Sequence, residues 1–315
     1  MSLISWQDLN LKSHPEPDWI VDPYIVREGI TLLWAGTSVG KSPLAINLAK
    51  CIGEGTPFFG LKTTQSRVLF IELDTPEMAA APRIKKLEAA PNVWFLFSKP
   101  LSIPEVPADQ KSMLFDAREE VEPELVIVNT LQKCHDMDGK DARTVKLVYS
   151  WFQYAFPNAA LCFVHHMRKA STDPKARVIS NEGFTGSNQW LADAQIGIHL
   201  EKYTGTKENL KLYHRKSQVS QQLKPMPLFL DTSEAGGGML LKCPLYDELL
   251  LTKETLDAHP GVSGGQADAL LKDTLNLSVS TCRKRRLTIE QGLFPGKGYL
   301  LRTPQEMAEE EEEDE

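Results

Sequence analysis

Long apolar runs are missing from this sequence, because no uninterrupted segment approaches the roughly 18 residues that a membrane-spanning helix needs. The opening residues, MSLISWQD, lack the basic and apolar regions of a signal peptide. Five cysteines are scattered without any C-x-x-C pair, which argues against a disulfide framework and against a zinc site. We therefore expect a cytoplasmic protein with reduced thiols and no membrane partner.

An excess of one charge is also missing from most of the chain. The net charge is −7, and the seven acidic residues at 309–315 account for all of it. We expect residues 305–315 to be an acidic disordered tail. With 42% hydrophobic and 24% charged residues, the 315-residue chain has room for one sizeable domain, expected over 1–243, and a small one over 244–304.

A glycine-containing segment, AGTSVGKS at residues 35–42, lies between an apolar run of strand length at 29–34 and a helical apolar pattern at 43–50. This order is typical of a phosphate-binding P-loop, here with alanine in place of the first glycine. Lys41 is expected to reach the β and γ phosphates, and the Ser42 hydroxyl is expected to face Mg²⁺. The pattern predicts ATP and Mg²⁺ as ligands, bound by Gly36, Thr37, Ser38, Val39, Gly40, Lys41, Ser42 and Pro43.

Strand-like runs recur along the chain, separated by segments long enough for helices, at 67–73, 92–97, 125–129 and 159–165. This alternation predicts an α/β fold with a mainly parallel sheet. Beyond residue 196 the runs are closer together and predict antiparallel edge strands at 196–201, 209–214, 228–231 and 239–242.

The apolar strand at 125–129 should end in an aspartate that holds the magnesium shell, but it ends in Asn129. An amide oxygen accepts a hydrogen bond and brings no negative charge. Ser42 and Asn129 are the predicted metal-site residues. Two explanations of Asn129 stay open, a naturally slow or altered ATPase and a deliberate Asp→Asn change.

Two acids stand near the carboxyl end of the strand at 67–73. Alternation places Glu72 and Asp74 on one face, where ligands bind in sheets of this kind. One of them is a candidate to orient the attacking water, together with Lys41 as the phosphate-binding catalytic residue. The alternative is that Asp74 or Thr75 only caps the following helix.

Two histidines end the strand at 159–165 and lead into a polar, basic segment. Adjacent strand residues point to opposite faces, so at most one of His165 and His166 meets the γ phosphate. Residues 170–181 are long and polar enough to form a functional loop, and they include Lys175 and Arg177.

The C-terminal region has short helical patterns at 253–258, 265–275 and 278–290, followed by the glycine-containing segment 292–301. Three helices and a hairpin predict a winged helix. Six basic residues and one acid lie between 281 and 302, which favours a nucleic-acid phosphate backbone over a solvated protein-binding surface. The candidate contacts here are Arg283, Lys284, Arg285, Arg286 and Lys297.

Together these residues resemble the RecA-like ATPases, and most closely the RepA-type hexameric replicative helicases, often described as an AAA-type ATPase domain. The resemblance covers about residues 18–242. It rests on DWIVD at 18–22, the P-loop, Glu72-Leu73-Asp74, the strand that ends at Asn129, His165-His166-x-x-Lys169, and Gly186-Ser187.

The resemblance implies specific roles. Asp74 looks like the counterpart of the catalytic glutamate, with Glu72 in reserve, and His166 looks like the γ-phosphate sensor. Residues 168–188 resemble the channel segment that touches single-stranded DNA, which makes Arg168, Lys169, Lys175 and Arg177 candidate contacts. Arg215 and Lys216 lie where a neighbouring subunit usually inserts a basic finger, so a homo-oligomeric ring, as in the hexamers, or a filament is implied.

Three functions are compatible with these features. The first is an ATP-driven motor on DNA, most like a replicative helicase of a plasmid, phage or mobile element. The second is an ATP-switched DNA-binding assembly with little turnover, and the third is a recombination mediator on single strands. Asn129, Asp74 and the basic C-terminal region favour the second over the first.

Overall fold

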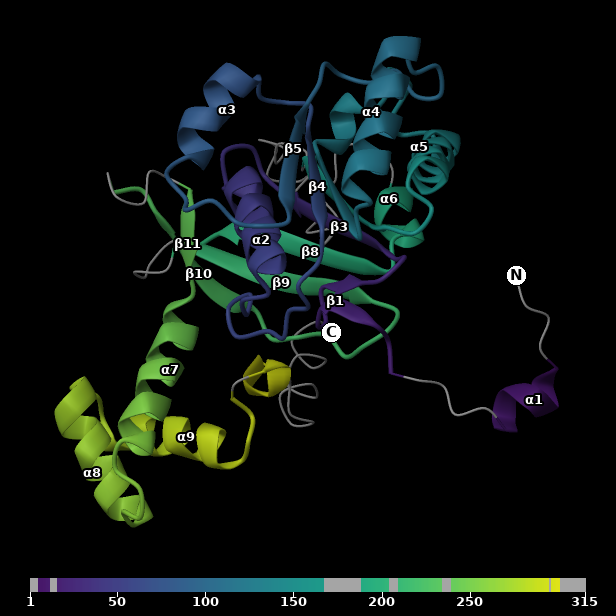
Figure 1. Ribbon diagram of the computed structural model, residues 1–315. Coiled ribbons are helices and arrows are strands. Elements are labelled where there is room, and N and C mark those ends of the chain that lie inside the picture. The colour runs from purple at the N-terminus through teal and green to yellow at the C-terminus, as the bar shows by residue number, and fades with distance from the viewer. Residues whose placement is uncertain are drawn as a thin grey trace, which may run out of the picture.

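The protein is described here by a computed structural model that covers residues 5–11, 16–166, 188–203, 209–233, 239–294 and 296–300. Its centre is a nine-stranded sheet in the order β11-β10-β9-β8-β3-β7-β6-β4-β5, and β1 and β2 form a separate pair (Figure 1). The strands are β1 (Trp19–Val21), β2 (Ile25–Val26), β3 (Ile30–Ala35), β4 (Val68–Glu72), β5 (Val93–Phe97), β6 (Leu125–Asn129), β7 (Ala160–His166), β8 (Ile196–Lys202), β9 (Leu210–Ser217), β10 (Met226–Asp231) and β11 (Leu240–Lys242). The helices are α1 (Trp6–Leu11), α2 (Lys41–Glu54), α3 (Glu77–Ile84), α4 (Ala108–Val121), the 3-10 helix η1 (Leu131–Lys133), α5 (Ala142–Ala155), α6 (Gln189–Asp193), α7 (Pro244–Asp257), α8 (Gly264–Leu275), α9 (Val279–Glu290) and the 3-10 helix η3 (Lys297–Leu300).

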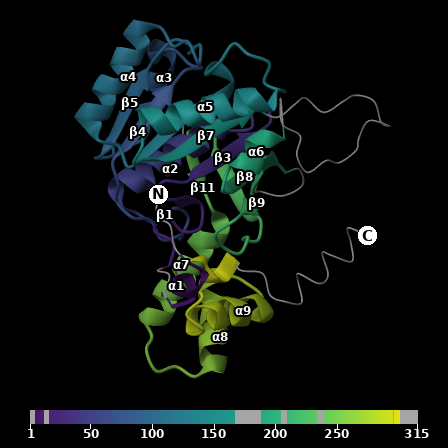
Figure 2. The same ribbon diagram turned by 90° about the vertical axis from the view of Figure 1, so that its right-hand side faces the viewer.

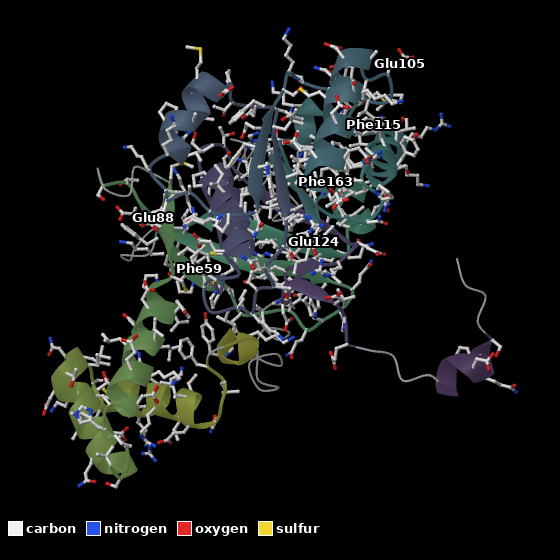
Figure 3. The ribbon with its side chains drawn as sticks, in the orientation of Figure 1. Phe59, Glu88, Glu105, Phe115, Glu124 and Phe163 are labelled. Atoms are coloured by element: carbon white, nitrogen blue, oxygen red, sulfur yellow. The ribbon has the colours of Figure 1, made fainter. Side chains whose placement is uncertain are left out.

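The middle of the sheet is parallel and buried on both faces. Strands β8, β3, β7, β6, β4 and β5 pair in parallel. The apolar runs predict this for all of them except β8, which was expected among the antiparallel edge strands and in fact runs parallel to β3 and antiparallel to β9. Along β3, Leu33 packs on the face covered by α2, whereas Leu32 and Trp34 pack on the face covered by α5 and α6. Figure 3 labels Phe163 of β7 inside this second layer. The predicted α/β class with a mainly parallel sheet is confirmed.

The predicted antiparallel edge is also present. β9 pairs antiparallel with β8, β10 with β9, and β11 with β10. Residues 234–238, which connect β10 to β11 and include the glycines expected to form a hairpin turn between them, lie outside the described residues.

The last edge strand is tied to the P-loop helix. The Asn47 amide on α2 donates from Nδ2 to the carbonyls of Pro43 (2.8 Å) and Met239 (2.5 Å). Its Oδ1 accepts from the backbone N–H of Leu241 at 3.4 Å. β11 ends at Lys242, and α7 begins two residues later, so only one residue separates this strand from the C-terminal helices.

The C-terminal region contains the three expected helices, with α7 longer than predicted (Figure 2). The glycine-containing hairpin expected after them is wrong, because Lys297–Leu300 form a 3-10 helix. Contacts with loops of the sheet domain explain the difference. The Tyr299 hydroxyl donates to the Phe59 carbonyl at 2.8 Å, and Lys297 Nζ pairs with Asp22 at 2.8 Å. These contacts hold the segment against the sheet domain and not as a projecting wing.

Within the described ranges, none of the helices combines the length and apolarity required to cross a bilayer.

Candidate active site

The P-loop joins the carboxyl end of β3 to the start of α2, in the order that the sequence predicts. Gly40 is the N-cap of α2, with φ of 113°, a backbone conformation that side-chain-bearing residues rarely adopt. No side chain caps this helix start, so its first N–H groups are oriented for an anion. Thr37 and Ser38 are exposed beside it, and the local geometry suits a phosphate group.

Lys41 is the most buried cation of this loop, with 5% of its surface exposed. Its Nζ donates to the carbonyl of Gly36 at 2.8 Å. Burial lowers the pKa of Lys41 to about 8, although the nearby Asp74 charge acts in the opposite direction. Burial therefore outweighs the stabilisation of the ammonium by Asp74.

Ser42, Asn129 and Glu72 form a hydrogen-bonded chain behind the loop. β4 and β6 are neighbours, and their register places Glu72 directly beside Asn129. Asn129 Nδ2 donates to Glu72 Oε2 at 2.6 Å and to Ser42 Oγ at 3.2 Å. Hydroxyl, amide and carboxylate oxygens suit Mg²⁺, and no cluster of three acidic, histidine or cysteine side chains that could hold a metal occurs in the described ranges. Ser42 and Asn129 thus stay the predicted residues of the Mg²⁺ site.

The two acids near β4 differ more than strand alternation predicts. β4 ends at Glu72, so Asp74 follows in a turn and is exposed, whereas Glu72 is 4% exposed. Glu72 Oε1 accepts from the backbone N–H groups of Asp74 (3.0 Å) and Thr75 (2.9 Å). Burial raises the pKa of Glu72, and the hydrogen bonds from Asn129 and these two N–H groups oppose that rise.

The placement of both acids on one face is therefore wrong, because the strand stops too early. Capping of α3 by Asp74 or Thr75 is wrong too, since Pro76 is the N-cap and no side chain caps the helix. Glu72 is the acid that binds the backbone of the turn.

The two histidines at the end of β7 have different surroundings. His165 is 3% exposed and packs near Trp190, with ring centroids 6.0 Å apart. His166 is half-buried, and its pKa is lowered, first by burial and then by the charge of Lys41. Of the two, His166 is thus the one whose pKa is lowered by the charge of Lys41 in the P-loop.

Lys133 at the end of η1 also contributes to the low pKa of His166. Sequence patterns did not single out this residue. Lys133 follows Asn129 by four residues in the segment after β6, and this proximity is the signal that could have indicated a role for Lys133 in the site.

Arg215 and Lys216, the candidate finger residues, lie beside the amino-terminal ends of the parallel strands, opposite to the ends that carry the P-loop. β9 runs antiparallel to β8, and Lys216 pairs with Gly197 near the amino end of β8. Lys216 Nζ donates to the carbonyls of Leu191 (2.8 Å) and Ala192 (2.6 Å), and the Arg215 guanidinium lies 4.1 Å from the ring centroid of Tyr213. Both cations are remote from the P-loop of their own chain. Figure 3 labels Glu124, which precedes β6 at this same amino-terminal edge.

The channel candidates Arg168, Lys169, Lys175 and Arg177 lie outside the described residues. Among the C-terminal bases, Arg283 and Lys284 are exposed on α9. Three others are already paired inside the chain: Arg285 with Glu248, Arg286 with Asp268 and Glu290, and Lys297 with Asp22. Contact of these five residues with a nucleic acid stays a prediction, and three of them would have to exchange or share an acidic partner to make it.

A family model described as an AAA domain matches residues 3–172, which include the P-loop, both acids, Asn129 and His166. The chain belongs to this AAA-domain family. No curated protein sequence matches the chain. Arg215, Lys216 and the C-terminal helices lie beyond the matched residues.

The fold has a counterpart among solved structures. A KaiC-like protein from the hyperthermophilic archaeon Pyrococcus horikoshii OT3 superposes with a TM-score of 0.50 and 9% sequence identity, covering 72% of this chain and 95% of that protein. At this identity the similarity concerns the fold. The AAA-domain match and the sheet topology together make this an AAA-type, RecA-like P-loop ATPase domain.

Proposed function

We propose that this chain is an ATP-binding and ATP-hydrolysing protein that works on DNA as a homo-oligomer, most like a replicative helicase. The observation that supports it best is the convergence of Lys41, Ser42 and Asn129 at the carboxyl ends of β3 and β6, two parallel strands that lie on either side of β7. In open α/β sheets, ligands bind at this edge.

The residues of the site divide the work. The N–H groups at the start of α2 and the Lys41 ammonium bind the phosphates. Ser42 and Asn129 are the residues that would hold Mg²⁺. Mg²⁺, when bound, neutralises the charge that develops on the phosphate oxygens. Asp74 is exposed and electrostatically close to Lys41 and His166, so it is our candidate to orient the attacking water, with Glu72 as the alternative. His166 is the candidate γ-phosphate sensor.

One observation supports a homo-oligomer. Arg215 and Lys216 lie at the edge of the sheet opposite to their own P-loop, so they can meet a nucleotide only on another copy. A ring, such as a hexamer, satisfies this requirement for every copy at once. Single-stranded DNA would then pass residues 168–188 in the channel, and Arg283 with Lys284 would contact duplex or single-stranded phosphates.

The test is steady-state ATP hydrolysis with and without single-stranded DNA. We expect turnover that DNA stimulates, and its loss in Lys41→Ala, because the buried ammonium is removed. Lys62→Ala removes an exposed cation and is the matched control. Normal nucleotide binding by Lys41→Ala would contradict the assignment of the site.

A second candidate, an ATP-switched DNA-binding assembly, is favoured by the neutral Asn129 at the metal side. It predicts nucleotide-dependent oligomerisation and DNA binding without turnover. Measuring the same preparation by hydrolysis and by sedimentation with and without ATP separates the two. A recombination mediator is the third alternative, and it predicts filaments on single strands in the same sedimentation experiment.

A further inference from the structure

The side-chain amide of Asn129 has one orientation that its neighbours accept. Asn129 is fully buried, and its Nδ2 lies 2.6 Å from Glu72 Oε2. An ionised carboxylate only accepts hydrogen bonds, so the amide nitrogen must face it. The flipped amide would place two acceptor oxygens at this short distance.

Glu72 can impose this orientation because it is fixed itself. Its second oxygen, Oε1, accepts from the backbone N–H groups of Asp74 and Thr75, and 4% of the residue is exposed. Every polar group that contacts this carboxylate is therefore a donor, which matches an ionised side chain. The turn after β4 thus acts as a clamp on Glu72.

The other side of the Asn129 amide faces the P-loop. Ser42 Oγ lies 3.2 Å from Nδ2 and 3.5 Å from Oδ1, which places this hydroxyl along the free edge of the amide. Ser42 and Glu72 also line the same small cavity, together with Thr75 and Arg83. The carboxylate, the amide and the hydroxyl therefore form one continuous unit that ends at the predicted magnesium position.

We propose that Glu72 is a positioning residue of the magnesium site, and that Glu72 with Asn129 replaces the single aspartate that P-loop ATPases place on this strand. Glu72 supplies the negative charge from the neighbouring strand β4. It also holds the Asn129 amide so that Oδ1 is directed away from the carboxylate and is available to a water molecule on the metal. The inference rests on the nucleotide site proposed above.

One consequence distinguishes this arrangement from a merely damaged aspartate site. Asn129→Asp would set a second carboxylate against Glu72 at hydrogen-bond distance, where like charges repel. That single change should not strengthen the metal site. Glu72→Gln in the same chain supplies an amide donor, so the double variant regains a complementary pair with the charge moved to position 129.

The experiment measures binding of a fluorescent ATP analogue in Mg²⁺ and in EDTA. The quantity compared between variants is the dissociation constant in EDTA divided by that in Mg²⁺, called the ratio below, which is large when Mg²⁺ strengthens binding. Glu72→Gln places an amide nitrogen opposite Asn129 Nδ2 and should turn the Asn129 amide over. We expect the ratio to fall about tenfold, in the range for a lost charge-assisted hydrogen bond, with affinity in EDTA unchanged. Asn129→Asp should also lower the ratio, and the double variant Glu72→Gln with Asn129→Asp should restore it. Glu77→Gln removes one exposed negative charge on α3 and should leave the ratio unchanged.

The outcomes separate this inference from the proposed function. The positioning role is refuted if Glu72→Gln and Glu77→Gln both keep the ratio of the unmodified protein. It is also refuted if the ratio of Asn129→Asp alone equals or exceeds that of the double variant. In either case the nucleotide site stands. If the unmodified protein binds no nucleotide in either condition, both proposals fail. Affinity in EDTA serves as the folding control, because it depends on the P-loop and not on the metal.

Discussion

Replacing Arg286 with alanine should unfold the three C-terminal helices while the sheet domain remains folded. Arg286 is 9% exposed and connects α9 to α8. Its Nε donates to Asp268 Oδ1 at 2.8 Å, its Nη2 to Asp268 Oδ2 at 3.3 Å, and its Nη1 to Glu290 Oε2 at 2.6 Å. Alanine would leave Asp268, itself 8% exposed, without this partner.

The cost follows from the burial of both charges. Breaking a fully buried pair by removing one partner costs about 3–5 kcal/mol, whereas an exposed pair contributes about 0–1 kcal/mol. The Arg286 and Asp268 side chains keep 10% and 11% of their surface exposed, so we take the lower end, about 3 kcal/mol. A small helical unit seldom has more than about 3–5 kcal/mol of stability from its own core. The change should therefore leave a large fraction of this unit unfolded.

Limited proteolysis and calorimetry measure this directly. In Arg286→Ala we expect rapid cleavage between residues 244 and 294 and a separate, lower thermal transition, with the main transition kept. Arg283→Ala is the matched control, since this cation is exposed on the same helix and should change stability by less than about 0.5 kcal/mol. Equal protease resistance of Arg286→Ala and Arg283→Ala would refute the structural role of Arg286.

Acid should weaken the same connection. The hydrogen bonds from Arg286 lower the pKa of Asp268. A lowered folded-state pKa gives a contribution that is complete above the ordinary aspartate value of about 3.9 and is lost as the pH falls through the folded value. The C-terminal transition of the unmodified protein should accordingly fall on acidification below about pH 4.

Two further predictions concern ligands. The pKa of Lys41 is about 8 in the free protein, and phosphate binds the ammonium form, so nucleotide affinity should decrease above pH 8, approaching tenfold per pH unit. Titration calorimetry at pH 8.5 in two buffers of different ionisation enthalpy should show proton uptake on binding, and identical heats would contradict it. Changing Arg283 and Lys284 to alanine should flatten the salt dependence of DNA binding by about two units of slope if both contact phosphates; an unchanged slope would remove α9 from the DNA interface.

The sequence predicted the sheet domain well because its signals are local. The P-loop pattern placed a strand, a turn with the left-handed Gly40 and a helix in the correct order. Continuous apolar runs indicated strands buried on both faces, and the edge strands β10 and β11 had recognisable lengths. Helix α4 was not singled out, since only Leu114 and Val121 are buried along it and its apolar pattern is weak.

The features that the sequence did not predict depend on contacts between distant positions. The pairing of Arg286 with Asp268 spans 18 residues, and the bond from Tyr299 to Phe59 spans 240. A count of basic residues treats Arg286 as available to a ligand, although its surroundings neutralise it. Glu72 and Asp74 were separated by the exact end of β4, which the apolar pattern alone does not define.

The amide of Asn47 connects the P-loop helix to the strand that leads into the C-terminal helices. It joins the first turns of α2 to β11, and β11 leads into α7 after a single residue. If the phosphates shift α2, the strain passes to the base of α7 through one side chain. Coupling of this kind is reciprocal. If nucleotide changes the affinity of the three helices for a bound molecule by some factor, that molecule changes the affinity for nucleotide by the same factor. Asn47 therefore offers a place to measure the communication between the two ends of the protein without altering either binding surface.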